Sequence, residues 1–258
     1  MSDPPLLEAT GLTLRFGAVA ALDDVSLAIW PGEVVAIVGE SGSGKTTLLR
    51  VLSGLARPQA GRATWRDAAG EALDVHGMAE SRRRLLHRTE WGFVHQNPCD
   101  GLRMGVSAGG NVGERLMAVG ARHYGNIRAE AASWLRRVEI DPARMDELPR
   151  NFSGGMQQRL QIARTLVTRP RLVFMDEPTG GLDVSVQARL LDMLRGLVAE
   201  LGLAVLIVTH DIAAARLLAH RLLVMRGGRV VEQGLTDRVL DDPQHPYTQL
   251  LVTSVLAA

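Results

Sequence analysis

The chain has 258 residues, of which 46% are hydrophobic and 22% charged, and its formal net charge at pH 7 is +1. This length suits one large α/β domain or a domain with an inserted lobe, and the hydrophobic fraction is sufficient for a core. A net charge near zero gives no electrostatic support for a nucleic-acid partner. The single cysteine, Cys99, can form neither an internal disulfide nor a cysteine-ligated metal cluster, which favours a reducing cytosol.

Targeting signals are not expected. Residues 1–8 lack the basic start and the apolar run of a signal peptide. No segment approaches the roughly 18 uncharged apolar residues of a membrane-spanning helix. We therefore expect a cytoplasmic protein that would work at the inner membrane only as a peripheral subunit.

The first part of the chain alternates between short strand patterns and turns. Residues 34–38, VVAIV, are apolar on both faces, which is typical of a buried parallel strand. A helix is predicted at 46–55. The other predicted strands are 6–14, 25–30, 62–65, 72–75 and 90–95, with 62–65 and 72–75 as edge strands.

The pattern becomes helical from about residue 97 to 168, with helices predicted at 108–119 and 128–138. We interpret this region as a helical lobe inserted into an α/β core, within a single domain that spans residues 1–258. The core pattern then resumes. It predicts a strand at 171–176, a helix at 184–201, a strand at 204–209, a hairpin of 222–225 and 229–232 around Gly227-Gly228, and a helical tail at 246–256.

Residues 39–46, GESGSGKT, match the phosphate-binding pattern G-x-x-x-x-G-K-[ST] between a buried strand and a helix. Glycines let successive backbone N–H groups face a phosphate, and the following helix N-terminus adds partial positive charge. Lys45, the only lysine of the chain, would reach the β- and γ-phosphates of ATP, and the Thr46 hydroxyl would ligate Mg²⁺. The residues expected to hold the nucleotide here are Gly39, Glu40, Ser41, Gly42, Ser43, Gly44, Lys45, Thr46 and Thr47.

Two acids, Asp176 and Glu177, follow the apolar residues 172–175. They would lie at the carboxyl end of a buried strand, where ligands bind in open α/β sheets. Asp176 would hold Mg²⁺ through water, and Glu177 would polarise the attacking water. Such a pair is often only a solvated strand end, and the phosphate-binding loop is what favours the catalytic interpretation.

A second anion site is indicated at residues 151–159, NFSGGMQQR. Ser153, Gly154 and Gly155 place a hydroxyl and open backbone amides at a helix N-terminus. One triphosphate needs only one such site, so the economical explanation is that this one serves the nucleotide of a neighbouring chain. The segment resembles the signature of the ABC ATPase family, L-S-G-G-Q, with Phe152 in place of Leu and Met156 in place of Gln.

Further family markers follow in order along nearly the whole chain. By this resemblance Phe16 stacks on adenine, and Gln96 senses Mg²⁺ and the γ-phosphate. Asp183 crosses to the partner's site, and His210 contacts the γ-phosphate. The structural alternatives are that Phe16 and His210 are core residues and that Gln96 is a solvated loop amide.

The resemblance implies an α/β P-loop NTPase fold, an ABC ATPase core with an N-terminal antiparallel β subdomain and an inserted α-helical subdomain. It also implies a head-to-tail homodimer, in which a second ABC subunit caps each ATP. Lys45, Gln96, Glu177 and His210 are the implied catalytic residues. The implied metal ligands are Thr46, Gln96 and Asp176, and the implied capping residues are Ser153, Gly154, Gly155 and Met156.

The less generic segments 89–103, 106–117, 120–125, 179–189 and 245–251 look like the K subunits of bacterial carbon–phosphorus lyase (phosphonate degradation) systems. That resemblance implies docking on the soluble lyase core complex, with the carbon–phosphorus bond broken elsewhere. The alternative is a dipeptide, oligopeptide, nickel or phosphonate importer, whose ATPase docks on membrane permease subunits. The HPYT tail at 245–248 does not discriminate between them. An ABC ATPase acting on DNA or ribosomes is disfavoured by the near-zero charge and the lack of a second cassette.

Overall fold

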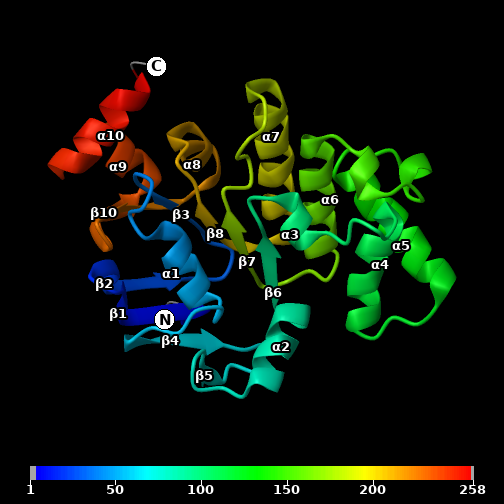
Figure 1. Ribbon diagram of the computed structural model, residues 1–258, viewed down its shortest axis with the longest axis horizontal. Helices are drawn as coiled ribbons and strands as arrows, with labels where there is room; N and C mark the ends of the chain where they lie inside the picture. The colour runs from blue at the N-terminus through cyan, green and yellow to red at the C-terminus, as the bar shows by residue number, and fades with distance from the viewer. Residues whose placement is uncertain (1–3, 257–258) are drawn as a thin grey trace. The chain divides into compact units, whose positions relative to one another are not determined.

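Figure 1 shows the computed structural model, which describes residues 4–256. The chain divides into two compact units. The first unit comprises the described residues up to Arg83 and from Gly202 onward, and the second spans Arg84–Leu201. Helix α2, Glu80–Thr89, crosses the boundary between them in the sequence.

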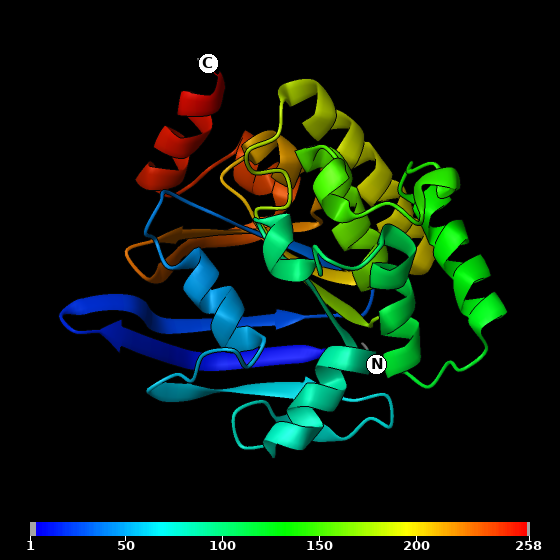
Figure 2. The ribbon, with the colours of Figure 1, turned by 45° about the vertical axis from the view of Figure 1, so that its right-hand side comes forward.

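An antiparallel sheet in the first unit has the strand order β2-β1-β4-β5 (Figure 2). Its strands are β1 (Leu7–Phe16), β2 (Val19–Ile29), β4 (Ala60–Arg66) and β5 (Ala72–Asp74). Alternate side chains of β1 are buried, as expected for a sheet with one covered face. The predicted antiparallel β subdomain is confirmed. The prediction of an edge strand at 62–65 is wrong, because β4 pairs with both β1 and β5.

A second set of strands in this unit is mostly parallel. Strand β3 (Val34–Val38) pairs in parallel with β8 (Ala204–Val208) and β9 (Arg221–Arg226), and β10 (Arg229–Leu235) returns antiparallel along β9. All residues of β3 and β8 are buried, which explains their continuous apolar runs. The helices of this unit outside α2 are α1 (Lys45–Leu52), α8 (Ile212–Leu218), α9 (Thr236–Asp241) and α10 (Pro246–Leu256).

The second unit combines a parallel strand pair with helices. The strands are β6 (Trp91–Val94) and β7 (Leu172–Asp176). The buried Trp91 and Phe174 rings meet edge-to-face, 5.7 Å between centroids. The helices are α3 (Pro98–Gly101), α4 (Ala108–Ala118), α5 (Tyr124–Arg137), α6 (Gly154–Leu166) and α7 (Val184–Leu201), with short 3₁₀ turns at Pro142–Arg144 and Pro149–Asn151.

Most predicted elements are present, with shifted ends. The helix predicted at 46–55 ends at Leu52, because Gly54 takes a left-handed φ of 72° and closes the helix. Helices α2, α3, α8 and α9 were not expected. Helix α2 escapes a periodicity search because only Leu86 among its ten residues is buried.

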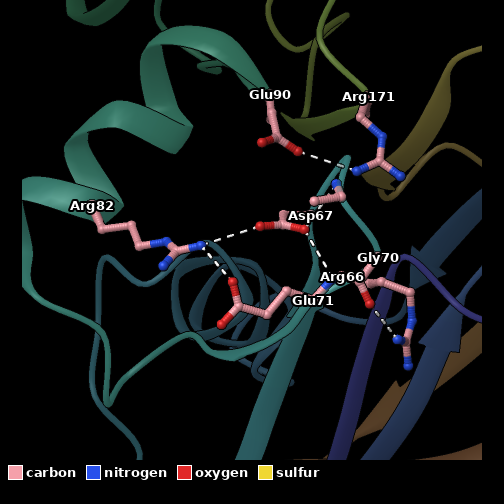
Figure 3. A network of polar contacts seen from close by, with 8 residues as sticks. Arg66, Asp67, Gly70, Glu71, Arg82, Glu90 and Arg171 are labelled. Carbon is pink, nitrogen blue, oxygen red and sulfur yellow. Dashed lines mark hydrogen bonds and ion pairs between the residues drawn. The ribbon is translucent and has the colours of Figure 1, made fainter.

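Asp67 fixes the connection between β4 and β5 (Figure 3). Its Oδ1 accepts the backbone N–H groups of Ala69 (3.0 Å) and Glu71 (2.9 Å). Its Oδ2 lies 3.1 Å from the Arg82 guanidinium, which also pairs with the Glu71 carboxylate at 3.0 Å. The start of helix α2 is thereby tied to this turn. In the second unit, the Arg171 guanidinium donates to the Glu90 carboxylate at 3.1 Å. Figure 3 marks this contact with a dashed line.

None of the helices among residues 4–256 is both long and apolar enough to cross a bilayer.

Candidate nucleotide site

The phosphate-binding loop joins β3 to α1 in the first unit. Gly39 and Gly44 are required by the geometry, since a Cβ on either would lie 2.2 Å from a backbone carbonyl oxygen, of Met225 and Ala21 respectively. Gly44 also holds a left-handed φ of 103° as the N-cap of α1. No side chain caps α1, and the N-terminus of a helix favours an anion.

Two buried side chains lie inside this loop. The Lys45 ammonium, 7% exposed, donates to the carbonyl oxygens of Gly39 and Glu40, both at 2.8 Å. The Ser43 hydroxyl is buried and has no hydrogen-bond partner among the described residues. A cationic side chain, an unpaired hydroxyl and uncapped amides in one loop fit a phosphate chain. Thr46, at the first turn of α1, is exposed and fits a Mg²⁺ ligand beside bound phosphates.

A residue from the far end of the chain also contacts the loop. The Tyr247 hydroxyl, at the start of α10, accepts the Glu40 N–H at 2.8 Å. The Arg226 guanidinium lies over the Tyr247 ring, 4.8 Å from its centroid. Sequence reasoning missed this residue; the only signal was the HPYT segment, which was used as a family marker.

His210 follows β8, the strand beside β3. Strands β3 and β8 are parallel, and Ile37 pairs with Val208. His210 and the phosphate-binding loop therefore both follow the carboxyl ends of these neighbouring strands. His210 is exposed, so the core-histidine alternative is wrong. Asp211 caps α8 by accepting the N–H groups of Ala213 (2.8 Å) and Ala214 (3.1 Å), which fixes the backbone beside His210.

In the second unit the structure brings Gln96 and Glu177 together. Strands β6 and β7 are parallel neighbours, and each of the two residues follows the end of one strand. The Gln96 amide donates to the Glu177 carboxylate at 3.0 Å. Glu177 has a φ of +42°, a left-handed conformation that is uncommon for a residue with a side chain. Asp176 is partly exposed at the end of β7.

Two buried glutamines of α6 hold the backbone just before Gln96. Gln161 accepts the His95 N–H at 2.6 Å and donates to the His95 carbonyl at 3.0 Å. Gln158 donates to the same carbonyl at 3.2 Å and is joined to Gln161 by a further bond of 3.2 Å. The signature segment also lies on α6, so this one helix positions both the signature segment and the backbone before Gln96. Sequence reasoning missed these residues, although two glutamines on a buried helix face are a recognisable signal.

The signature segment begins α6. Ser153 is the N-cap, and its Oγ accepts the Met156 N–H at 3.4 Å. Ser153 and Gly154 are exposed, whereas Gly155 is buried beside α7, where a Cβ would lie 2.5 Å from a Val186 methyl group. Ser153 and Gly154 therefore face solvent, while Gly155 is packed against α7.

Both departures from the family signature contact Arg144. The guanidinium lies over the Phe152 ring, 4.6 Å from its centroid, and donates to the Met156 sulfur at 3.3 Å. Glu147 holds Arg144 with two bonds, at 2.8 and 2.7 Å, and this pairing raises the pKa of Arg144 and lowers that of Glu147. Phe152 and Met156 thus form one packed cluster with Arg144.

The remaining candidates are exposed. Phe16, at the end of β1, is 62% exposed, which rules out the core alternative and leaves its ring available to a ligand. Asp183 is exposed just before α7. Among the described residues no group of three or more His, Cys, Asp or Glu side chains is arranged to hold a metal. Mg²⁺ bound with nucleotide needs only one or two protein ligands beside phosphates and water.

Comparisons with known proteins agree on one family. A family model described as ABC transporter matches residues 22–180. An Escherichia coli (strain K12) protein named as a phosphonates utilization ATP-binding protein, PhnK, is 67% identical over 98% of each chain. A Brucella ovis protein named as a peptide import ATP-binding protein is 38% identical over 99% of this chain and 79% of its own length.

Solved structures give the same result. The ATP-binding cassette MJ0796, described as a dimer in a post-hydrolysis state bound to ADP and Pi, has a TM-score of 0.79 and 30% identity, covering 89% of this chain and 98% of that one. The cbiO1 protein of Clostridium perfringens, described as part of the ABC transporter complex cbiONQ, has a TM-score of 0.80 and 29% identity over 93% and 92% of the two chains.

Proposed function

The chain belongs to the ABC transporter ATPase family and is an ATP-binding, ATP-hydrolysing subunit, and from that premise we propose that it serves phosphonate degradation as the ATPase of a carbon–phosphorus lyase system. The observation that carries the proposal is the 67% identity to PhnK over 98% of both chains, against 38% to the Brucella peptide import protein. The partner in this proposal is the soluble lyase core complex, and the location is the cytoplasm.

The proposed binding roles follow from the local geometry. Lys45 exchanges its bonds to the Gly39 and Glu40 carbonyls for the β- and γ-phosphates, and the amides at the start of α1 hold the phosphate chain. The exposed Phe16 ring stacks on adenine. Thr46, Gln96 and Asp176 are the proposed Mg²⁺ ligands, and the bound ion would neutralise charge developing on the phosphates.

The proposed hydrolytic roles belong to three polar residues. Glu177 accepts a hydrogen bond from the attacking water and so orients it. Gln96 holds the Glu177 carboxylate in position through their 3.0 Å hydrogen bond. His210 donates to the γ-phosphate as it leaves. No covalent intermediate is needed, since positioning and charge neutralisation account for phosphoryl transfer to water.

We further propose a head-to-tail homodimer of single cassettes, residues 1–258, each with a helical lobe at about 97–168. Ser153, Gly154, Gly155 and Met156 of one copy would cap the ATP of the other, with Asp183 beside the joint. The dimeric cassette MJ0796 bound to ADP and Pi supports this arrangement. Ser153 and Gly154, exposed at the start of α6, are suited to contact a phosphate supplied from outside the chain.

Glu177→Gln tests the dimer. The amide keeps the side-chain shape but cannot act as the base, so ATP stays bound and the closed dimer accumulates. Light scattering with ATP should report twice the monomer mass for Glu177→Gln, with ATPase activity reduced at least about 100-fold. A monomeric variant with normal turnover would refute both the role and the dimer.

The partner is tested with the same variant. Glu177→Gln is co-expressed with lyase core subunits and, separately, with an importer permease pair, and is purified in ATP. Co-purification of the soluble core supports the proposal. Co-purification of the permease instead would establish the importer alternative. The observation behind that alternative is the 38% identity to a peptide import protein.

A further inference from the structure

A polar pocket of about 240 Å³ lies within the second unit, apart from the residues assigned to ATP. The side chains that matter to its chemistry are those of His87, His95, Asp100, Arg115 and Arg164. They come from α2, the end of β6, α3, α4 and α6. The volume is below the roughly 300–1,000 Å³ of sites for drug-sized ligands, so the pocket suits a small ligand with a few waters.

Arg115 has far fewer partners than its chemistry needs. A guanidinium carries five N–H donors, yet the one hydrogen bond of Arg115 among residues 4–256 goes from Nη2 to the His87 carbonyl, at 3.1 Å. Its Nε is buried without a partner. Burial lowers the pKa of Arg115, and the neighbouring Arg164 and Arg88 cations lower it further, against an opposing effect of Glu114.

The two acidic side chains near Arg115, Glu114 and Asp100, do not neutralise its charge. The Glu114 carboxylate is held by Arg103 and by Arg164, each at 2.9 Å. Asp100 is exposed, so its carboxylate keeps its contact with water. Partly buried cations are normally paired with an anion. The pocket therefore has an excess of positive charge and of hydrogen-bond donors.

We propose that this pocket binds a small phosphoryl oxyanion, either inorganic phosphate or a short phosphonate, with Arg115 as the principal ligand. A tetrahedral –PO₃ group offers several acceptor oxygens and up to two negative charges, which match the fork of N–H donors on Arg115. His95 lines the same pocket, and its imidazole can contribute an N–H donor.

The test is a calorimetric titration of the isolated chain with inorganic phosphate, methylphosphonate and acetate. The phosphate-binding loop is a competing site, so it is inactivated with Lys45→Ala or, in the wild-type chain, filled with a non-hydrolysable ATP analogue. We expect a dissociation constant on the order of 1 mM for phosphate or methylphosphonate. Arg115→Gln should weaken binding at least about tenfold. Arg136→Gln, an exposed arginine on α5 outside the pocket, is the matched control.

Each outcome decides the proposal. Tighter binding of methylphosphonate identifies a substrate-like ligand, tighter binding of phosphate a product-like one, and both support the site. Binding that Arg115→Gln leaves unchanged would refute it. Acetate binding as tightly as both phosphoryl anions would also refute it, because the pocket would then recognise a carboxylate. No partner complex enters this experiment, so its failure would leave the proposed function untouched.

Discussion

Arg144 links the two unusual residues of the signature segment. Its guanidinium covers the Phe152 ring and donates to the Met156 sulfur, and Glu147 fixes it in place. A leucine and a glutamine, as in the usual signature, would give Arg144 neither the ring nor the sulfur. The two departures are therefore explained together as packing around one arginine, and the Ser153 hydroxyl remains exposed.

Arg144→Ala should loosen the start of α6 and so displace the groups proposed to cap ATP. We expect the ATPase kcat to fall about tenfold with little change in the melting temperature, because misplacing a catalytic group costs more than losing an exposed ion pair. Steady-state kinetics checks this, with the exposed Arg150→Ala as control. Equal kcat values for the two variants would mean that the cluster has no part in catalysis.

Single residues were predictable from the sequence where a motif fixes both type and neighbour. Lys45 and Gly44 lie in the expected loop, and Gln96 meets Glu177 because each follows a buried strand. The contacts of Arg144 were not predictable, since neither its spacing nor its type indicates a sulfur or a ring as partner. The exposure of Phe16 was likewise open, because a strand-end aromatic can face either way.

The C-terminal helix α10 is joined to the phosphate-binding loop through Tyr247, 207 residues from Glu40 in sequence. The segment before the helix is held in turn by Glu232 of β10, whose carboxylate accepts the N–H groups of Gln244 and His245, both at 2.9 Å. The C-terminal tail thus supports the first residues of the phosphate-binding loop. This gives the HPYT segment at 245–248 a structural role.

Tyr247→Phe removes the hydroxyl and leaves the Glu40 N–H without its acceptor, while the ring stays under Arg226. One lost hydrogen bond is worth about 1 kcal/mol, so we expect the KM for ATP to rise about fivefold with kcat nearly unchanged. Tyr124→Phe, at a 74% exposed position on α5, is the control. A fall in kcat alone would contradict a role in forming the binding loop.

The Glu232 contacts should make the tail sensitive to acid. Burial raises the pKa of Glu232, but hydrogen bonds that include those from the backbone N–H groups of Gln244 and His245 outweigh it, and the net pKa is lowered. A carboxylate with a lowered folded pKa stabilises the fold fully above its unfolded pKa of about 4.3, and this contribution is lost as the pH falls from there through the lower folded pKa. Wild type should therefore melt above Glu232→Gln at pH 7, and the difference should shrink by pH 3.5. A constant difference would refute this.

Helices and strands were predictable where burial imposes a clear pattern of apolar residues. Strands β3 and β8 are buried on both faces and read as unbroken apolar runs. Half of the residues of helix α2 are charged and only Leu86 is buried, and Arg82 pairs with Asp67 (Figure 3). The position of β4 inside its sheet depends on pairing with β1, a long-range choice that local patterning does not encode.

At the scale of the whole molecule, ATP binding would add to the free energy of unfolding of the chain. A ligand that binds only the folded chain stabilises it by an amount that grows with the logarithm of the ligand concentration above its dissociation constant. ATP binding is therefore a measurable part of the stability of the fold.

Mg-ATP at about 100 times its dissociation constant should add about 2.7 kcal/mol, which for a chain of this size raises Tm by roughly 5–10 °C. Differential scanning fluorimetry on Glu177→Gln, which does not consume the ligand, measures this. Removing Mg²⁺ with EDTA should abolish most of the shift if Thr46 and Asp176 act as proposed. A full shift in EDTA would show that the metal contributes little to binding.

The fold class was predictable because the phosphate-binding loop and the order of the motifs indicated one family, and the resemblance to that family implied the antiparallel N-terminal sheet that the structure contains. The pocket around Arg115 was not, because its walls come from five elements separated in sequence by up to 78 residues, from His87 to Thr165.

The buried Lys45 also governs how the chain responds to amine-directed reagents. As the only lysine, it carries the only ε-amino group, and that group is enclosed by two carbonyl oxygens. Acylating reagents should therefore label this side chain slowly, and bound nucleotide should slow them further, so modification at one position reports occupancy of the site. For the same reason, lysine-to-lysine cross-linkers find almost no reactive amine on the surface of this chain. Contacts with partners are better mapped by cross-linking through carboxylates or through the exposed thiol of Cys99.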